Sequence, residues 1–212
     1  MGTQYIILEG QDGSGKDLQA ELLMQHFQDN GLDPLLVQEP CSDLPTGKLL
    51  RQLLKSGEYQ EAHPGLFLAD RMTLQAHVIK PALEAGRPVV SVRSFLSTVC
   101  YQTEQYDVSW LWDIHRILPV KPTHVVILDV DPEVASKRMD VDNRTREIFE
   151  RIEIQKRIRQ RYLDLPSSGR FWDSLEPHGK CKIVPTPGNM TVAGSKQWIH
   201  QEIWDFVNLE IL

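Results

Sequence analysis

Short apolar runs alternate along the chain with longer stretches in which apolar residues recur every three or four positions. The short runs predict strands that are covered on both faces, and the longer stretches predict amphipathic helices. Strands are expected at Tyr5–Glu9, Leu35–Gln38, Pro88–Val92, His124–Asp129 and Cys181–Pro185. Helices are expected at about Asp17–Asn30, Gly47–Ser56, Pro64–Ala85, Phe95–Gln102, Trp110–Leu118, Pro132–Met139, Thr145–Leu163 and Thr191–Asn208.

This alternation of strands and helices predicts an α/β domain with a parallel sheet and right-handed crossovers. Ligands of such sheets bind beyond the carboxyl ends of the strands. Polar residues follow three of the expected strands at this position, namely Asp12–Lys16, Glu39 and Arg93. They are therefore the first candidates for a site.

The first expected strand runs directly into the glycine-rich segment GQDGSGKD, residues 10–17, and a helix is expected to follow. Glycines let backbone N–H groups turn toward a phosphate, a helix N-terminus adds positive potential, and Lys16 can reach the β- and γ-phosphates. The segment predicts an ATP site formed by Gly10, Gly13, Ser14, Gly15, Lys16 and Asp17. Asp17 occupies the place where a Ser or Thr hydroxyl normally binds Mg²⁺, and a carboxylate can also bind that ion.

Composition narrows the class of protein. The 212 residues suit one domain with a sizeable core. A net charge of −6 argues against a surface that binds nucleic acid or an anionic membrane. Three cysteines without metal-binding spacing indicate reduced thiols in a cytoplasmic setting. No apolar run is long enough to span a membrane, and no signal or transit peptide is expected.

Seven segments, taken in order, resemble the thymidylate kinase family of P-loop nucleoside monophosphate kinases. They are residues 8–16, 38–40, 66–71, 78–83, 97–102, 128–135 and the basic segment that ends at Tyr162-Leu163. The resemblance implies a P-loop NTPase-type three-layer sandwich, with a parallel central sheet flanked by helices. It implies a single domain over residues 1–212 with a basic helical lid at about 137–151. It also implies a cytoplasmic homodimer that uses ATP and Mg²⁺ to phosphorylate a deoxypyrimidine monophosphate, dTMP above all.

The resemblance also implies an acceptor site. Asp12 would contact the 3′-hydroxyl, Phe67 would stack on the pyrimidine, and Arg71, one helical turn later, would contact the base or the monophosphate. Arg93 would hold the acceptor phosphate. The implied acceptor-binding residues are Asp12, Glu39, Phe67, Arg71, Arg93, Thr98, Tyr101 and Gln102. Structural roles remain open for several of them: Asp12 can hold its own loop, Arg71 can pair with Asp70 or Glu39, and Tyr101 and Gln102 can pack their helix.

The chain departs from the family pattern at several of these positions. Val92-Arg93-Ser94 replaces Asp-Arg-Tyr or Asp-Arg-Phe, so an acid near the metal is absent, whereas Asp17 adds one. One hypothesis is that the metal-binding acid has moved across the site, with Asp17 and Glu39 as metal ligands. The other hypothesis is that the family residues at positions 17 and 92 were lost independently of each other. Gln38 replaces an arginine, and the usual lid arginine is replaced by Ile148. The expected catalytic residues are Lys16, Arg93, Arg144 and Arg146.

Three functions are compatible with these residues. The first is phosphorylation of dTMP by ATP. The second is a kinase with another acceptor, such as a modified pyrimidine nucleotide, a nucleoside or a hydroxyl on a modified base in DNA, although the acidic net charge disfavours DNA. The third is a nucleotide-binding homologue without catalytic activity, which the loss of the loop hydroxyl, the acid at Val92 and the lid arginine would explain.

Overall fold

A parallel five-stranded sheet forms the centre of the computed structural model, which describes residues 3–141, 152–186 and 192–208. The strands are β1 (Tyr5–Glu9), β2 (Leu35–Gln38), β3 (Val89–Val92), β4 (His124–Asp129) and β5 (Lys180–Pro185), in the order β2-β3-β1-β4-β5. In the register of this sheet, Leu8 lies opposite Val92 on one side and Val126 on the other. The predicted parallel α/β fold is therefore confirmed.

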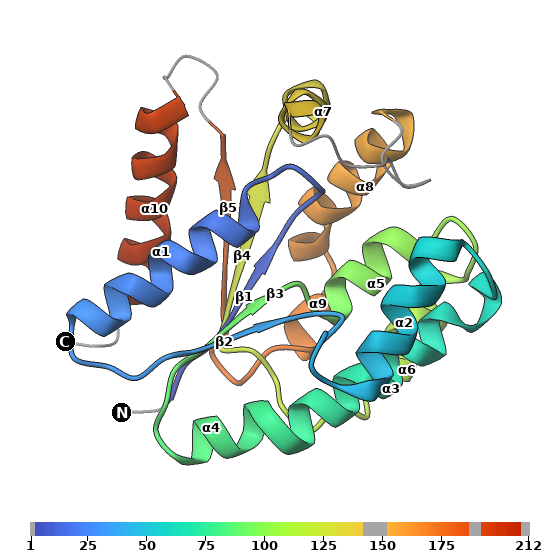
Figure 1. Ribbon diagram of the computed structural model, residues 1–212, viewed down its shortest axis with the longest axis horizontal. Coiled ribbons are helices and arrows are strands. Elements are labelled where there is room, and N and C mark those ends of the chain that lie inside the picture. Colours follow the sequence, from blue (N-terminus) through green and yellow to red (C-terminus); the bar gives the residue numbers. More distant parts are fainter. Residues whose placement is uncertain (1–2, 142–151, 187–191, 209–212) are drawn as a thin grey trace.

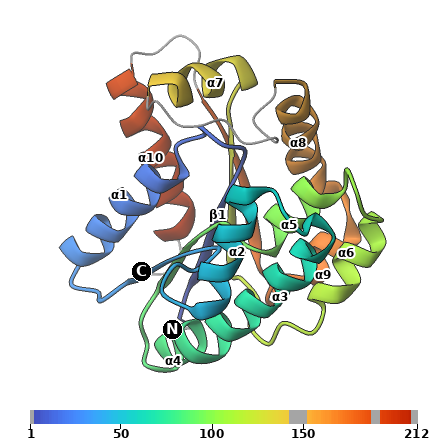
Figure 2. The ribbon, with the colours of Figure 1, turned by 45° about the vertical axis from the view of Figure 1, so that its right-hand side comes forward.

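Helices cover both faces of the sheet (Figures 1 and 2). The helices are α1 (Lys16–Asp29), α2 (Pro45–Ser56), α3 (His63–Leu74), α4 (Lys80–Glu84), α5 (Phe95–Gln102), α6 (Val108–His115), α7 (Pro132–Val141), α8 (Ile152–Asp164), α9 (Gly169–Asp173) and α10 (Val192–Asn208). Helices α1 and α10 pack on one face against strand residues such as Ile6 and Leu8. Tyr5 and Ile7, which alternate with them along β1, face the opposite side, where α3 and α4 pack.

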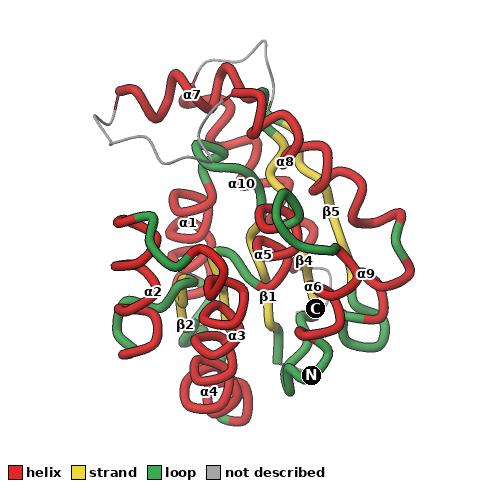
Figure 3. Tube along the Cα trace, turned by 90° about the vertical axis from the view of Figure 1, so that its right-hand side faces the viewer, coloured by secondary structure: helices red, strands yellow, loops and turns green. Residues whose placement is uncertain are grey.

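The helix predicted at Pro64–Ala85 is divided into three parts. A π-helical turn, η2 (Gln75–Ile79), separates α3 from α4. Pro81 offers a physical reason, because a proline lacks the N–H for a regular helix and its ring crowds the carbonyl four residues earlier. Two short 3₁₀ segments, η1 (Gln60–Ala62) and η4 (Leu165–Ser167), were not predicted. The five-residue helix α9, which is labelled in Figure 3, was not predicted either. The predicted helix Thr145–Leu163 corresponds to α8 from Ile152 onward, and its earlier residues lie outside the described ranges.

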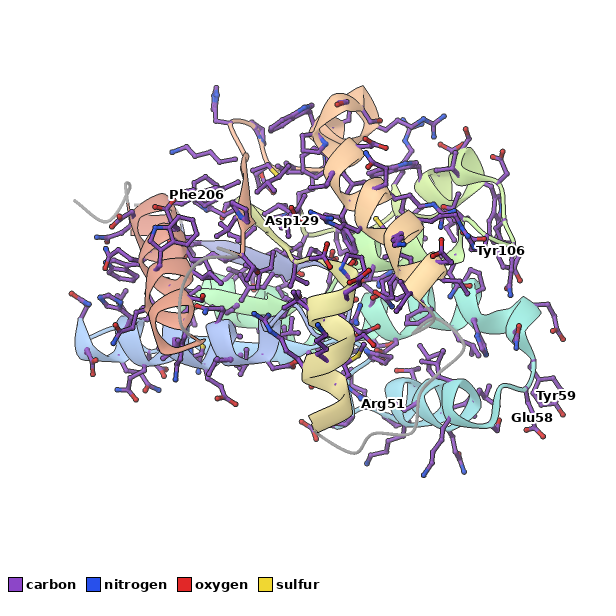
Figure 4. The ribbon with its side chains drawn as sticks, turned by 90° about the horizontal axis from the view of Figure 1, so that it is seen from above. Arg51, Glu58, Tyr59, Tyr106, Asp129 and Phe206 are labelled. Carbon is purple, nitrogen blue, oxygen red and sulfur yellow. The ribbon has the colours of Figure 1, made fainter. Side chains whose placement is uncertain are left out.

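The carboxyl ends of the strands point toward α7 and α8 (Figure 1). Asp129 ends β4 and accepts hydrogen bonds from Arg159 of α8, at 2.5 Å from Nε and 3.0 Å from Nη2. Viewed from above, Asp129 lies near the middle of the molecule, with Phe206 and Tyr106 on opposite sides (Figure 4). In the part of the chain that the structure describes, no helix is both long and apolar enough to cross a bilayer.

Candidate active site

The loop between β1 and α1 has the shape that its glycines permit. Gly10 and Gly13 have φ angles of 138° and 74°, in the left-handed region that favours glycine. A side chain on Gly13 would lie 2.6 Å from the carbonyl oxygen of Ala135, and one on Gly10 would lie 2.5 Å from that of Leu128. The loop is therefore packed tightly between β4 and α7, and only glycine fits at these two positions.

Lys16 is held inside this loop. Its buried Nζ donates to the carbonyl oxygens of Gly10 and Gln11, at 2.9 and 2.8 Å, and to Ser14 Oγ at 3.3 Å. Burial, with a further contribution from the positive charge of Arg93, lowers the pKa of Lys16 to about 8. The loop thus holds the cation at the first turn of α1, where a phosphate would be stabilised.

Asp12, Arg93 and Tyr101 form one cluster beside the loop. Arg93 Nη2 donates to Asp12 Oδ1, Tyr101 Oη donates to Asp12 Oδ2 at 3.0 Å, and the Arg93 guanidinium lies 5.1 Å from the Tyr101 ring centroid. Burial raises the pKa of Asp12, but Arg93 and Lys16 more than offset this and hold it below its usual value. The acceptor-site residues expected in the loop, after β3 and on α5 therefore lie together. The Asp12 carboxylate contacts both Arg93 and Tyr101.

The backbone at Arg93 is unusual. Its φ is 71°, a left-handed conformation that costs a residue with a side chain on the order of 1–3 kcal/mol. Hydrogen bonds hold it there: Arg93 N donates to Leu8 O at 3.0 Å, and Ser91 Oγ donates to Arg93 O at 2.8 Å. This conformation directs the side chain toward Asp12 at the end of the sheet.

A second cluster surrounds Arg71 of α3, whose side chain is almost fully buried. Its Nε and Nη2 lie 2.7 and 2.6 Å from Glu39 Oε2, Nη2 lies 3.4 Å from Thr98 Oγ1, and Nη1 lies 2.7 Å from His115 Nε2. The Arg71–Glu39 pair is thus present. Glu39 Oε1 is buried and has no hydrogen-bond partner in the part of the chain that the structure describes. Such an atom is costly to leave without a partner and is therefore a candidate ligand contact.

The remaining candidates differ in position. Asp70 accepts from Cys41 N and Thr46 Oγ1, both at 2.8 Å, so it joins α3 to the segment after β2. Phe67 is half-buried on α3. Gln102 is buried at the end of α5, where its carbonyl accepts from Gln105 N and Tyr106 N. Arg144 and Arg146 lie outside the described residues.

Three departures from the family pattern meet at one place. Gln38 Nε2 donates to Asp17 Oδ1 at 3.1 Å, and Gln38 lies opposite Val92 in the β2–β3 ladder. Val92 is only 3% exposed and packs in the core beneath α1. Gln38 therefore connects Asp17, the additional acid, to Val92, the strand position at which the family's acid is absent.

Sequence reasoning did not single out three further residues. Glu9 is fully buried and accepts from Ser94 Oγ at 2.6 Å, Ser97 Oγ at 2.7 Å and Tyr162 Oη at 2.9 Å, so it joins β1 to α5 and α8. Arg138 Nη1 of α7 donates to Gly13 O at 3.3 Å, and burial lowers the pKa of Arg138. The third is His115. Only the basic character of the segment around Arg138 was a signal in the sequence.

The fold and this loop define a P-loop NTPase. The family model of thymidylate kinase matches residues 8–172, and the chain therefore belongs to the thymidylate kinase family. It is 33% identical to a probable thymidylate kinase of Thermococcus gammatolerans, over 98% of this chain and 97% of that protein. It is 38% identical to one of Thermococcus kodakarensis, over 76% of this chain and 83% of that protein. A crystal structure of thymidylate kinase from Ehrlichia chaffeensis shares the fold, with a TM-score of 0.72, 22% identity and coverage of 99% of this chain and all of the other.

Proposed function

We propose that the protein transfers the γ-phosphoryl group of ATP to dTMP, forming ADP and dTDP. The observation that carries the proposal is the contact between Asp12 and Arg93. Asp12 belongs to the phosphate loop that holds Lys16, whereas Arg93 follows β3, so the contact joins a donor cradle to a cationic acceptor cluster. Membership of the thymidylate kinase family supports the same reaction.

In the reaction, an oxygen of the dTMP phosphate attacks the γ-phosphorus of ATP, and the bond from that phosphorus to the β–γ bridging oxygen breaks. Positioning and charge neutralisation supply most of the catalysis in such transfers. Lys16 neutralises the β- and γ-phosphates, and Arg93 leaves Asp12 in part to hold the acceptor phosphate. No residue has to remove a proton, because the attacking phosphate is already ionised.

The base of the acceptor is assigned to the Arg71 cluster, with Phe67 stacked on the ring and Thr98 at its edge. A guanidinium can only donate hydrogen bonds. It therefore favours a pyrimidine with a carbonyl oxygen at position 4, as in thymine, over cytosine, which has an amino group there. Asp12 and Tyr101 are assigned to the sugar on the family resemblance, and the hydrogen bond between their side chains supports a shared position beside the loop.

The magnesium ion is proposed to be held by Asp17 or Glu39. Asp17 presents an exposed carboxylate next to Lys16, and Glu39 Oε1 is buried and accepts no hydrogen bond from the described residues. Oxygen ligands suit Mg²⁺, which typically binds through one or two carboxylates together with substrate phosphates. The described residues contain no group of three or more metal-ligating side chains, and such a site does not require one. When bound, the ion would neutralise charge on the phosphates.

The donor side would be completed by the lid. We propose that Arg138, which already contacts the loop at Gly13, contributes a cation to the ATP phosphates. Arg144 and Arg146 remain the expected transition-state cations within the lid at about 137–151. The enzyme is further proposed to act in the cytoplasm, which the three free thiols support.

A homodimer is also proposed. It rests on the family resemblance, which led us to expect the interface on the Pro64–Ala85 and Phe95–Gln102 helices. Met72 of α3 is exposed, whereas every residue of α5 is buried within this chain, so only the first of these helices remains proposed for the interface. Light scattering in solution should give twice the monomer mass. A monomeric mass at micromolar concentration would refute this part of the proposal.

The proposed reaction is tested by ADP release in a coupled assay with dTMP, dUMP, dCMP, dAMP and dGMP, with and without Mg²⁺. The highest kcat/KM is expected for dTMP. Lys16→Ala should abolish turnover, whereas Lys156→Ala, at an exposed lysine paired with Glu153, is the matched control and should leave it unchanged. Turnover with another acceptor above that with dTMP, or none with any acceptor, would contradict the proposal.

A further inference from the structure

His115 ends α6 and lies buried against Arg71, 44 residues away in sequence. Its Nδ1 lies 2.6 Å from the carbonyl oxygen of Leu111, and its Nε2 lies 2.7 Å from Arg71 Nη1. A carbonyl oxygen only accepts hydrogen bonds and a guanidinium only donates them. The two partners therefore place the imidazole proton on Nδ1 and leave the lone pair of Nε2 facing Arg71.

The hydrogen bonds of Arg71 leave one N–H of Nη1 unassigned. A guanidinium has five N–H groups in one plane. Glu39 Oε2 accepts from Nε and lies 2.6 Å from Nη2 as its ion-pair partner, Thr98 Oγ1 accepts from Nη2, and His115 accepts from Nη1. The second N–H of Nη1 has no partner among the described residues. Because both hydrogens of Nη1 lie in the guanidinium plane, a partner for the first fixes the direction of the second.

We propose that His115 is a positioning residue, which holds Arg71 so that this remaining Nη1 N–H faces the base of the acceptor nucleotide. The inference rests on the proposed function, in which Arg71 contacts the base edge. A donor fixed in direction favours a carbonyl oxygen at position 4 of the pyrimidine and disfavours an amino group there. His115 thereby contributes to selection of the acceptor without touching it.

The surroundings of His115 suit this role. The side chain is only 5% exposed, and the Phe95 ring lies 5.8 Å away, so the imidazole has little freedom to turn. Burial and the adjacent charge of Arg71 lower the pKa of His115 to about 3. The ring is therefore neutral at physiological pH and keeps the lone pair that accepts from Arg71.

Two substitutions separate hydrogen bonding from packing. His115→Phe keeps a ring of similar size but removes the acceptor, whereas His115→Gln retains an acceptor oxygen near the position of Nε2. His115→Phe should raise KM for dTMP by about tenfold or more, the factor expected when a hydrogen bond to a charged group is lost. Its ratio of kcat/KM for dTMP over dCMP should fall, and KM for ATP should not change. His115→Gln should stay within about threefold of wild type, since it restores that bond.

The matched control is His63→Phe. His63 is another buried histidine, on α3, and its Nε2 contacts Glu58 O at 3.0 Å and not Arg71. Its substitution should leave both KM values unchanged. The inference is overturned if His115→Phe leaves KM for dTMP unchanged, if the control raises it equally, or if His115→Gln is as defective as His115→Phe.

Two further outcomes are informative. If His115→Phe does not fold, His115→Asn takes its place in the comparison. The asparagine side chain can mimic Nδ1 but is too short to reach Arg71. Equal KM values for dTMP in the Asn and Gln variants would then overturn the inference. If the wild type phosphorylates dTMP and His115→Phe has the same KM for dTMP as the wild type, the positioning role alone is refuted. A wild type without turnover on dTMP refutes the proposed function, and this inference with it.

Discussion

Arg71 and Glu39 form an ion pair in the interior, with side chains 2% and 3% exposed. Arg71→Met would keep most of the side-chain volume and leave the Glu39 carboxylate buried without its cation. Removing one partner of a buried pair costs about 3–5 kcal/mol. For 212 residues, an unfolding entropy of about 2.1 cal/mol/K per residue gives roughly 0.45 kcal/mol/K, so the expected loss of Tm is about 7–11 °C.

The double variant Arg71→Met/Glu39→Gln removes both charges and should recover most of this loss, because no charge remains buried and unpaired. The assay is thermal unfolding without ligands, by calorimetry, for the wild type, both single variants and the double variant. Arg170→Met is the matched control. Its partner Asp113 lies at 2.8 Å, but both side chains are about half exposed, so the pair contributes about 0–1 kcal/mol.

The pH dependence of the Tm deficit provides a second test of the buried ion pair, because its direction can be predicted. Burial raises the pKa of Glu39 and Arg71 opposes that rise, so the pKa should rise further in Arg71→Met. When the pKa of an acid is higher in the folded state than in the unfolded state, the protein loses stability as the pH increases through the folded-state pKa. The Tm deficit of Arg71→Met should therefore be larger at pH 8 than at pH 5, whereas the Tm of the double variant, which has no carboxyl group at position 39, should lack this contribution to its pH dependence. A single variant within 2 °C of wild type, or additive losses in the cycle, would refute this reasoning.

Four other results are expected. Arg93→Ala should weaken dTMP binding by about 1.5–3 kcal/mol in calorimetry while ATP binding changes much less; equal losses for both ligands would reverse the assignment of donor and acceptor sides. Asp17→Ser should raise the Mg²⁺ concentration needed for half-maximal rate, and an unchanged Mg²⁺ titration would remove Asp17 from the metal site. ATP affinity should fall by up to about tenfold between pH 7 and pH 9, as Lys16, with its pKa of about 8, loses its charge; a flat profile measured by calorimetry would argue against this. Tyr162→Phe should lower stability by about 1.5–3 kcal/mol, because Glu9 loses a hydrogen bond in the interior, and a Tm unchanged within 1 °C would contradict this.

The strands and the phosphate loop were predictable because their signals are local. The bounds of β1, β2 and β4 match the prediction, and β3 and β5 differ by one residue at their starts. Each signal lies within a few consecutive residues, as an apolar run or as glycines that precede a lysine. The helix predicted at Pro64–Ala85 shows where local signals end. The segment is helical, but its middle, Gln75–Ile79, is a π-helical turn that the apolar pattern did not predict.

The side-chain networks were not predictable, because their partners are distant in sequence. Glu9 lies within an apolar strand, and its partners are 85, 88 and 153 residues away. His115 resembles any other residue on a partly apolar helix until the fold brings it to Arg71. The sequence offered Glu39 and Asp70 as alternative partners for Arg71; the structure selects Glu39, and Asp70 binds the segment after β2 instead.

The central claim is that this site converts dTMP and ATP into dTDP and ADP. The most direct measurement is anion-exchange separation of the products formed by the wild type in the presence of Mg²⁺, with Lys16→Ala in parallel. The account predicts dTDP and ADP in equal amounts from the wild type and neither from the variant. ADP with free phosphate but no dTDP, or equal conversion by Lys16→Ala, would contradict it.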